Sequence, residues 1–385
     1  MKSLLLTYDY PPTIGGIANI LATFMRLAGD RDCLILAPGA DGAREFDAAH
    51  PVPTVRFPVV NSLGLVGRLL SFLLASTWTF CWLLRQRPDL VVAGQVARAG
   101  PVVYLWHKLT GKPYYVWAYG GETSFEFLPS SLLTRFLHHI LRRSRVLFTN
   151  SPFTTSEMVT FGMAAERVVE IPRGVDHQVF FPAAADRSYV ERFGLQDRLV
   201  FLTLGRLIER KGVDRMLETL ARLEGELPAW HYMVVSDGPY RGRLEALTDE
   251  LGLREKVTFT GYIEREELPI YYNLCDVFAM PNREVEGDGA GALSVEGFGT
   301  VFVEAAVCAK PVIAGRSGGA VFAVYDGVNG IVVDPDDVGD ISRAVQRLAD
   351  PSTRERMGSA GVEFAARFDW ESSGEILRRY LERVH

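Results

Sequence analysis

The feature that most constrains the fold is the alternation of short apolar runs with longer helical patterns, which occurs twice along the chain. The runs are rich in Val, Leu, Ile and Phe and mostly end in Gly, Asp, Ser or Pro, as is typical of parallel strands buried on both faces. Because helical patterns separate the runs, we expect right-handed crossovers and doubly wound α/β sheets. The predicted strands lie within 3–9, 32–38, 89–94, 114–120 and 145–151 in the first series, and within 199–206, 230–238, 256–261, 276–281, 310–315 and 330–334 in the second.

The length of the chain suits two domains. Its 385 residues exceed the usual size of a single hydrophobic core. A proline and a run of small residues mark a linker at 175–189, between the two series of strands. We therefore expect Rossmann-like domains at 1–175 and 190–366, with a C-terminal helix at 367–385 that packs back towards the first domain. Ligands bind beyond the carboxyl ends of parallel strands, so the expected site is a cleft between two facing sheets.

The composition excludes several classes of protein. Hydrophobic residues make up 48% and charged residues 23%, which is typical of a folded protein. The net charge of −6 argues against a general nucleic-acid binder. The cysteines lack a C-x-x-C pair and zinc-ligand spacing, so no metal site is indicated. We expect all four to be reduced core residues of a cytoplasmic protein: Cys33, Cys81, Cys275 and Cys308.

Two stretches of the first domain suit either internal packing or contact with a membrane. Residues 69–84 form an uncharged run between Arg68 and Arg85 that is shorter than the about 20 residues of a spanning helix. Residues 135–145 combine cations with apolar residues at helical spacing, which fits a solvated face or an anionic membrane surface. The N-terminus is predicted as a strand and not a signal peptide. The expected location is therefore the cytoplasm, with reversible peripheral contact at the inner face of the cell membrane as the second interpretation.

The first loop, YDYPPTIGGIANI, connects a predicted strand to an amphipathic helix. Gly15 and Gly16 carry no side chains, so a phosphate or sugar could approach the backbone closely. An ordinary tight turn is the alternative. The loop has no G-x-G-x-x-G pattern, so the sequence does not support a nicotinamide cofactor.

Two cations follow the first strand of the second domain, in LGRLIERKGVDRML. Arg206 leaves the strand at its carboxyl end, and Lys211 lies five positions further on. Arg grips a phosphate through two parallel hydrogen bonds, whereas Lys acts as a compact charge, so the pair is suited to a diphosphate. Two solvated surface cations are the alternative.

The stretch EGFGTVFVEA, residues 296–305, predicts an anion site at a helix N-terminus. Gly299 makes the turn, and the amides of Thr300 and Val301 begin the helix, where the dipole favours an anion. Two carboxylates would repel a diphosphate, so each must face a neutral polyol. Glu304 could accept hydrogen bonds from a ribose diol, and Glu296 could reach sugar hydroxyls. A nucleotide-sugar offers this alternation of ribose, diphosphate and hexose.

The pattern from Glu296 to Glu304 resembles the E-x7-E signature of family-four retaining glycosyltransferases with the GT-B fold. The resemblance spans nearly the whole chain. Arg173, within IPRGVD, stands where the family commonly has asparagine. Further matching stretches are GRLIERKGVD, GPYRGRLEAL, GYIEREEL, YYNLCDVFAMP and GRSGGAVFAVYDGVNGIVVDP.

The resemblance implies a role for each matching residue. The first domain would bind the acceptor and the second the nucleotide-sugar donor. In YGGE, residues 119–122, the places where histidines can occur hold Tyr119 and Gly121, which leaves Glu122 or a backbone group near the sugar. The diphosphate would be bound by Arg206 and Lys211, the ribose by Glu304 and the transferred sugar by Glu296. Backbone contacts would come from Gly15, Gly16, Gly299, Thr300 and Val301, and the base would be framed by Tyr262 and Ile263.

The function that the resemblance implies is transfer of a sugar, with retention, from a nucleotide-diphosphate donor to a hydroxyl of a lipid-linked or glycan acceptor. The expected catalytic residues are Arg206, Lys211 and Glu296, with no metal or other cofactor. A GT-B epimerase or phosphorylase is an alternative, as is a non-catalytic subunit that binds nucleotide-sugar. The sequence leaves the base, sugar, acceptor and linkage open.

Overall fold

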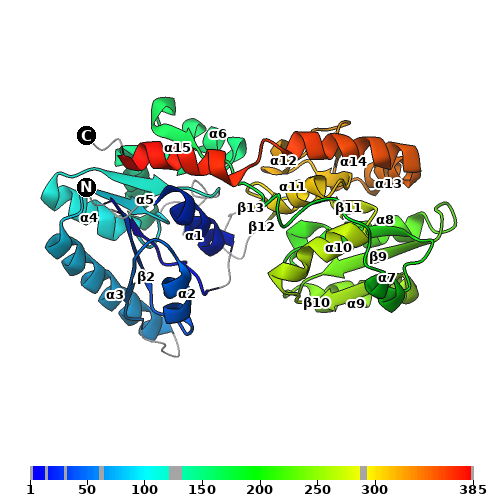
Figure 1. Cartoon of the computed structure of the whole chain (residues 1–385), viewed down its shortest axis with the longest axis horizontal. Coiled ribbons are helices and arrows are strands. Elements are labelled where there is room, and N and C mark those ends of the chain that lie inside the picture. Colours follow the sequence, from blue (N-terminus) through cyan, green and yellow to red (C-terminus); the bar gives the residue numbers. More distant parts are fainter. Residues whose placement is uncertain are drawn as a thin grey trace. The chain divides into compact units, whose positions relative to one another are not determined.

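The computed structural model describes residues 3–13, 16–29, 33–59, 65–120, 132–286 and 293–382. The chain divides into two compact units (Figure 1). The first unit comprises Met1–Gly174 and Trp370–His385, and the second comprises Val175–Asp369. Because the chain returns to the first unit at Trp370, the C-terminal helix belongs with the N-terminal sheet.

The first unit is built on a seven-stranded parallel sheet with the order β3-β2-β1-β4-β5-β6-β7. Its strands are β1 (Ser3–Leu6), β2 (Cys33–Pro38), β3 (Thr54–Phe57), β4 (Leu90–Ala93), β5 (Tyr114–Trp117), β6 (Val146–Thr149) and β7 (Val168–Glu170). Its helices are α1 (Gly16–Ala28), α2 (Ala43–Ala49), α3 (Leu65–Gln86), α4 (Gly100–Thr110), α5 (Leu132–Arg143), α6 (Pro152–Thr160) and α15 (Trp370–Glu382), with a short 3-10 turn at η1 (Ala165–Arg167).

Alternate residues of each strand enter different cores because side chains alternate across a sheet. Leu4 and Leu6 of β1 pack with residues of α3, α4 and α5. Leu5 faces the opposite side and packs with residues of α1 and α15. Figure 1 shows α15 in red beside α1, and the two helices are in contact. Both faces of the sheet are therefore covered, as the apolar strands require.

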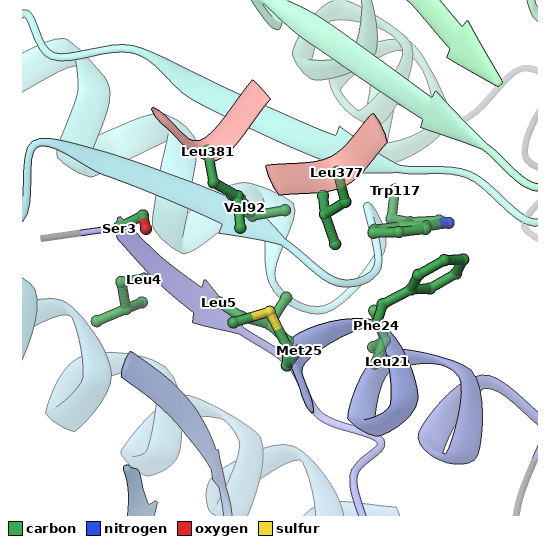
Figure 2. A pocket seen from close by; sticks show the side chains of 10 residues that line it. All are labelled: Ser3, Leu4, Leu5, Leu21, Phe24, Met25, Val92, Trp117, Leu377 and Leu381. Carbon is green, nitrogen blue, oxygen red and sulfur yellow. The ribbon is translucent and has the colours of Figure 1, made fainter. Parts of the chain in front are cut away.

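A small apolar pocket lies between β1, α1 and α15 (Figure 2). Leu377 and Leu381 of α15 cover it, Leu5 and Met25 lie opposite, and Trp117 closes one end. Ser3 is its one polar lining residue, and no titratable side chain reaches it. The pocket is therefore a packing feature of α15 and has no chemistry of its own.

The first unit differs from the sequence prediction at three places. β3 and β7, the two edge strands, were not predicted; they are short and largely half-buried. The predicted helix at 69–84 is confirmed, but α3 is longer, and it exposes Cys81, which was wrongly expected in the core. Among the described residues, no helix is long and apolar enough to cross a membrane.

The second unit contains a six-stranded parallel sheet, ordered β10-β9-β8-β11-β14-β15, and a small antiparallel pair, β12-β13. The strands are β8 (Leu199–Leu204), β9 (Trp230–Val235), β10 (Val257–Gly261), β11 (Val277–Met280), β12 (Val285–Glu286), β13 (Leu293–Ser294), β14 (Val312–Gly315) and β15 (Gly330–Val333). The helices are α7 (Arg187–Phe193), α8 (Val213–Arg222), α9 (Arg241–Glu250), α10 (Leu268–Leu274), α11 (Thr300–Val307), α12 (Ala320–Ala323), α13 (Val338–Ala349) and α14 (Pro351–Ala365), with 3-10 turns at η2 (Glu209–Lys211), η3 (Arg254–Lys256) and η4 (Arg265–Glu267).

Two cores cover this second sheet. Residues of α10, α11 and α12 pack on one face, and residues of α8, α9 and α13 pack on the other. The strand order of each unit reverses direction once, between β1 and β4 in the first sheet and between β8 and β11 in the second. In open parallel sheets, ligands bind at the carboxyl ends of the strands beside such a switch point. The candidate ligand sites are therefore the loops that follow β1, β4, β8 and β11.

Candidate functional site

The loop after β8 carries the predicted cations of the second unit. Arg206 leaves the strand two residues after Leu204, and its side chain is exposed. Lys211 ends the 3-10 turn η2 and is buried. One cation is thus open to solvent, and the other is held within the protein at the switch point.

Glu296 lies between two cations of this loop. Its Oε2 accepts a hydrogen bond from Lys211 Nζ at 2.7 Å and another from Arg210 Nη1 at 2.6 Å. Only 12% of the Glu296 side chain is exposed. Burial alone would raise the pKa of Glu296, but the charges and hydrogen bonds of Lys211 and Arg210 outweigh it and lower the pKa to about 2. Glu296 is therefore ionised at neutral pH.

Arg283, in the loop after β11, supports the turn that carries Arg210 and Lys211. Its guanidinium bonds both oxygens of Asp214, at 2.9 and 2.7 Å, and one oxygen of Glu209 at 3.2 Å. Its backbone N–H donates to Arg210 O at 2.9 Å. Burial alone would lower the pKa of Arg283, but these ion pairs raise it above its usual value. The loop after β11 is thus joined to the turn η2 by this backbone hydrogen bond and to the first turn of α8 by the buried Arg283–Asp214 ion pair.

The helix α11 begins directly after the loop that holds Glu296. Gly299 caps its N-terminus with φ 83°, a left-handed conformation that favours glycine. The amides of Thr300 and Val301 are in the first turn and have no acceptor within the helix. Gly319 N donates to Glu296 O at 2.6 Å, and a side chain at Gly319 would collide with the backbone of Gly297. The loop after β14 therefore holds Glu296 beside the positive end of α11.

Glu304 lies one turn inside α11. Its Oε2 accepts a hydrogen bond of 2.7 Å from the hydroxyl of Tyr272, a fully buried residue of α10. Burial raises the pKa of Glu304, although the Tyr272 hydrogen bond and the charge of Arg265 oppose that shift. The second oxygen of Glu304 is not used in this bond, so the carboxylate can still accept a hydrogen bond from a ligand.

The remaining predicted residues are more scattered. In the second unit, Tyr262 is 58% exposed just after β10, whereas Ile263 is half-buried and packs against the core. In the first unit, Gly16 begins α1, and Tyr119 stacks on Trp117 after β5. The other predicted residues of the first unit lie outside the described residues: Gly15, Gly121 and Glu122.

Three contacts of the site escaped the sequence analysis. They involve Arg210, a neighbour of the predicted Lys211, Tyr272, within YYNLCDVFAMP, and Arg283. Arg283 follows the strand next to β8 at the switch point, and strand order cannot be read directly from the sequence. The available signal is a charged residue three positions after the buried strand β11.

These groups offer both charges to a ligand. Lys211, Arg210 and the start of α11 favour an anion, and Glu296 and Glu304 present carboxylate oxygens. Glu304 can accept hydrogen bonds from hydroxyl groups.

The two units match two protein families. The family described as "Glycosyltransferase Family 4" matches residues 14–179, and the family described as "Glycosyl transferases group 1" matches residues 188–364. Together with the parallel sheets of the two units, these matches define a glycosyltransferase with the GT-B fold.

Relatives along the whole chain establish the family. A GDP-mannose-dependent alpha-(1-6)-phosphatidylinositol monomannoside mannosyltransferase of Mycolicibacterium smegmatis is 35% identical, with 98% of this chain and 97% of the relative covered. A GDP-mannose-dependent monoacylated alpha-(1-6)-phosphatidylinositol monomannoside mannosyltransferase of Corynebacterium glutamicum is 28% identical, with 99% and 98% covered. The chain belongs to the family-four glycosyltransferases.

Solved structures confirm the expected fold. HepE of Anabaena, solved with UDP, has a TM-score of 0.80 at 22% identity, with 99% of each chain covered. Sucrose-phosphate synthase of Thermosynechococcus elongatus has a TM-score of 0.80 at 21% identity, with 99% of this chain and 98% of that chain covered. Two Rossmann-like parallel-sheet units of GT-B type are therefore established.

Proposed function

We propose that this glycosyltransferase retains the anomeric configuration of its sugar and transfers a hexose from a nucleotide-diphosphate donor to a hydroxyl of a lipid-linked acceptor. The names of its whole-length relatives favour GDP-mannose as the donor and a mannosylated phosphatidylinositol as the acceptor. The second unit binds the donor, and the first binds the acceptor. The product belongs to cell-surface glycoconjugate synthesis at the cytoplasmic side of the membrane.

The observation that carries the proposal is Glu296 held between Arg210 and Lys211, directly before the N-terminus of α11. A donor whose diphosphate lies at this N-terminus can contact Lys211 and, from the solvent side, Arg206. Its ribose reaches Glu304 and its sugar reaches Glu296. Tyr262, exposed, and its neighbour Ile263 lie after β10 and border the base in this proposal.

The catalytic contribution of these residues is positioning and charge stabilisation. When the sugar–phosphate bond breaks, negative charge grows on the leaving diphosphate, and the cations Arg206 and Lys211 and the N-terminus of α11 stabilise it. Arg210 also binds Glu296, so Lys211 can turn towards the diphosphate without leaving that carboxylate unpaired. The leaving phosphate oxygen accepts the acceptor's proton on the same face of the sugar. The proposal needs no metal ion.

An acceptor in a membrane requires the protein to reach the lipid surface. The helices α3, α4 and α5 lie side by side on one face of the first sheet, where α4 contacts both neighbours. We define the lipid-facing surface as a set of exposed apolar and basic side chains on these helices. Its members are Leu70, Leu73, Leu74, Leu105, Leu109, Leu132, Leu133, Phe136, Arg135, Arg142 and Arg143. Apolar residues interspersed with arginines suit reversible binding to anionic lipids.

A thermal-shift screen against GDP-mannose, UDP-glucose and ADP-glucose tests the donor site. A nucleotide-sugar at 100 times its dissociation constant stabilises a protein by about 2.7 kcal/mol. We expect GDP-mannose to raise the melting temperature of the wild type most, and the Lys211→Ala variant to lose most of that rise. If none of the three nucleotide-sugars stabilised the wild type, the proposal would be contradicted. Release of mannose from the donor by the wild type separates a catalyst from a non-catalytic binding subunit.

A further inference from the structure

Asn282 is a fully buried polar residue in the loop after β11. It lies two residues beyond the carboxyl end of β11, the strand that runs between β8 and β14 in the second sheet. A buried amide side chain needs hydrogen-bond partners for both its oxygen and its nitrogen. The partners of Asn282 therefore show which part of the protein this residue holds in place.

Both ends of the Asn282 amide bind the backbone at the end of β14 and in the loop that follows it. Gly315 N donates to Asn282 Oδ1 at 3.2 Å, and Asn282 Nδ2 donates to Ser317 O at 3.3 Å. A side chain at Gly315 would collide with the backbone of Asn282, so the two loops pack directly against each other. Asn282 thus fixes the beginning of the loop after β14 at two points.

The same loop holds the main chain of Glu296. Two residues beyond Ser317, Gly319 N donates to Glu296 O at 2.6 Å. The position of this backbone donor depends on the path of the loop, and Asn282 fixes that path at Ser317. A continuous series of hydrogen-bonded and covalent contacts therefore leads from Asn282 to the main chain of Glu296.

Arg283, the next residue in the chain, supports Glu296 from the other side. Its backbone N–H donates to Arg210 O at 2.9 Å, and Arg210 Nη1 donates to the Glu296 carboxylate at 2.6 Å. Asn282 therefore acts on the main chain of Glu296, whereas Arg283 acts on a cation that binds its side chain. Two consecutive residues of one loop support the same carboxylate in different ways.

We propose that Asn282 is a positioning residue for sugar transfer, which places Glu296 against the transferred sugar through the loop after β14. The inference rests on the proposed function, in which Glu296 contacts that sugar. A group at a reacting centre must be held within about 0.5 Å of its productive position, and the contacts behind it supply this precision. Loss of the Asn282 amide should therefore impair the reaction of the sugar and leave binding of the nucleotide diphosphate intact.

Two measurements on the full-length protein test this separation: calorimetric titration with GDP, and steady-state transfer from GDP-mannose to phosphatidylinositol monomannoside. Asn282→Ala should lower kcat by about ten- to hundredfold, because a misplacement of about 1 Å can cost that much. Its affinity for GDP should stay close to that of the wild type. Asn282→Asp keeps the shape of the side chain and the acceptor for Gly315, but the ionised carboxylate has no donor for Ser317. It should also lower kcat, and it provides the test if Asn282→Ala does not fold.

A double variant tests whether Asn282 acts through Glu296. In a protein that already carries Glu296→Ala, the further change Asn282→Ala should lower kcat little, because the group that Asn282 positions is absent. Losses of kcat that multiply in the double variant would overturn the proposal.

Asn329 provides a matched control. It is also a fully buried residue of the second unit, and its Oδ1 accepts from Tyr325 N at 2.6 Å, but it precedes β15 at the amino end of that strand. Asn329→Ala should lower stability to urea, as Asn282→Ala does, and leave kcat near that of the wild type. Equal losses of kcat in these two variants, or loss of GDP binding by Asn282→Ala, would overturn the inference alone. A wild type that transfers no mannose would overturn the proposed function and this inference with it.

Discussion

At the residue scale, the site depends on one carboxylate that forms ion pairs with two cations. Glu296 neutralises part of the charge of Arg210 and Lys211, which would otherwise repel each other in a half-buried loop. A strongly ionised Glu296 also keeps an acceptor for sugar hydroxyls next to a helix end that favours phosphate. In the proposed function, this arrangement of charges matches the alternating sugar, diphosphate and ribose of a nucleotide-sugar donor.

Removing a cation should slow transfer more than it weakens folding. We expect Lys211→Ala and Arg206→Ala each to lower turnover by roughly a hundred- to thousand-fold, the usual effect of losing one preorganised donor to a developing charge. Arg243→Ala removes an exposed cation of α9 and should leave turnover near that of the wild type. Steady-state kinetics at saturating donor measures all three. Normal turnover in both Lys211→Ala and Arg206→Ala would contradict the assignment.

Replacement of Glu304 and replacement of Glu296 should have different effects on kcat and KM. Glu304→Ala should chiefly raise the KM for the donor, because a ribose contact exists equally in the ground state and the transition state. Glu296→Ala should also lower kcat, since its contact lies at the reacting sugar. Measuring kcat and KM for both variants tests this difference. An equal loss of kcat in the two variants would refute separate roles for Glu296 and Glu304.

The lowered pKa of Glu296 predicts how stability depends on pH. A fall from 4.5 to about 2 corresponds to about 3 kcal/mol of stabilisation by the charged form. This contribution is complete above about pH 5 and is lost as the pH falls through about 2. Urea unfolding of the wild type and of Glu296→Gln should therefore show a stability difference that shrinks between pH 5 and pH 2. Glu250→Gln, at an exposed ion pair, should show little difference at any pH. If the stability difference between the wild type and Glu296→Gln stayed constant with pH, the ion pairs would not be the origin of the lowered pKa of Glu296.

At the scale of elements, two loops make one structure at the switch point of the second sheet. The turn η2 follows β8 and carries Lys211, and the loop after β11 carries Arg283. Arg283 connects them through a backbone hydrogen bond to Arg210 and a buried ion pair with Asp214 at the start of α8. The loop after β14 completes the arrangement through Gly319 and Glu296.

Breaking this connection should be costly. Arg283→Met leaves Asp214 buried without its partner, and removal of one member of a buried ion pair typically costs about 3–5 kcal/mol. Arg243→Met breaks an exposed pair and should cost under about 1 kcal/mol. Urea unfolding of the two variants measures both losses of stability. A double variant, Arg283→Met with Asp214→Leu, should recover part of the loss; no recovery would show that Arg283 acts by another route.

The elements of the fold were largely predictable, and the contacts of the site were not. Long apolar strands such as β8 and β9 can be predicted from the sequence, because a strand that is buried on both faces needs a continuous run of apolar residues. The edge strand β3 reads TVRF and carries Arg56, so it lacks that signal. Lys211 and Glu296 were predicted as separate ligands, but their contact joins positions 85 residues apart. Only the fold brings them together.

At the scale of the whole molecule, the proposed function assigns a different task to each unit. The second unit offers cations and a helix end to the diphosphate of the donor, and the first unit carries the lipid-facing surface.

The lipid-facing surface predicts salt-sensitive binding to anionic vesicles. Each basic residue near such a surface contributes about 1 kcal/mol, so replacing Arg142 and Arg143 of this surface, together with the neighbouring exposed Arg145, by Ser should weaken co-sedimentation by roughly a hundredfold at low salt. Replacing three exposed cations of the second unit, Arg243, Arg343 and Arg347, should have little effect. Leu105→Ser with Leu109→Ser should weaken binding at all salt concentrations. Equal binding by every variant would show that another surface contacts the lipid.

The proposed reaction is transfer of a sugar to a lipid with retention of configuration. The most direct test incubates the protein with GDP-mannose, whose mannose is α-linked, and vesicles that contain phosphatidylinositol monomannoside, followed by NMR of the extracted lipid. We predict a lipid product with one additional α-linked mannose, formed by the wild type and nearly absent with Lys211→Ala. A β-linked product, or release of free mannose without any lipid product, would contradict the account.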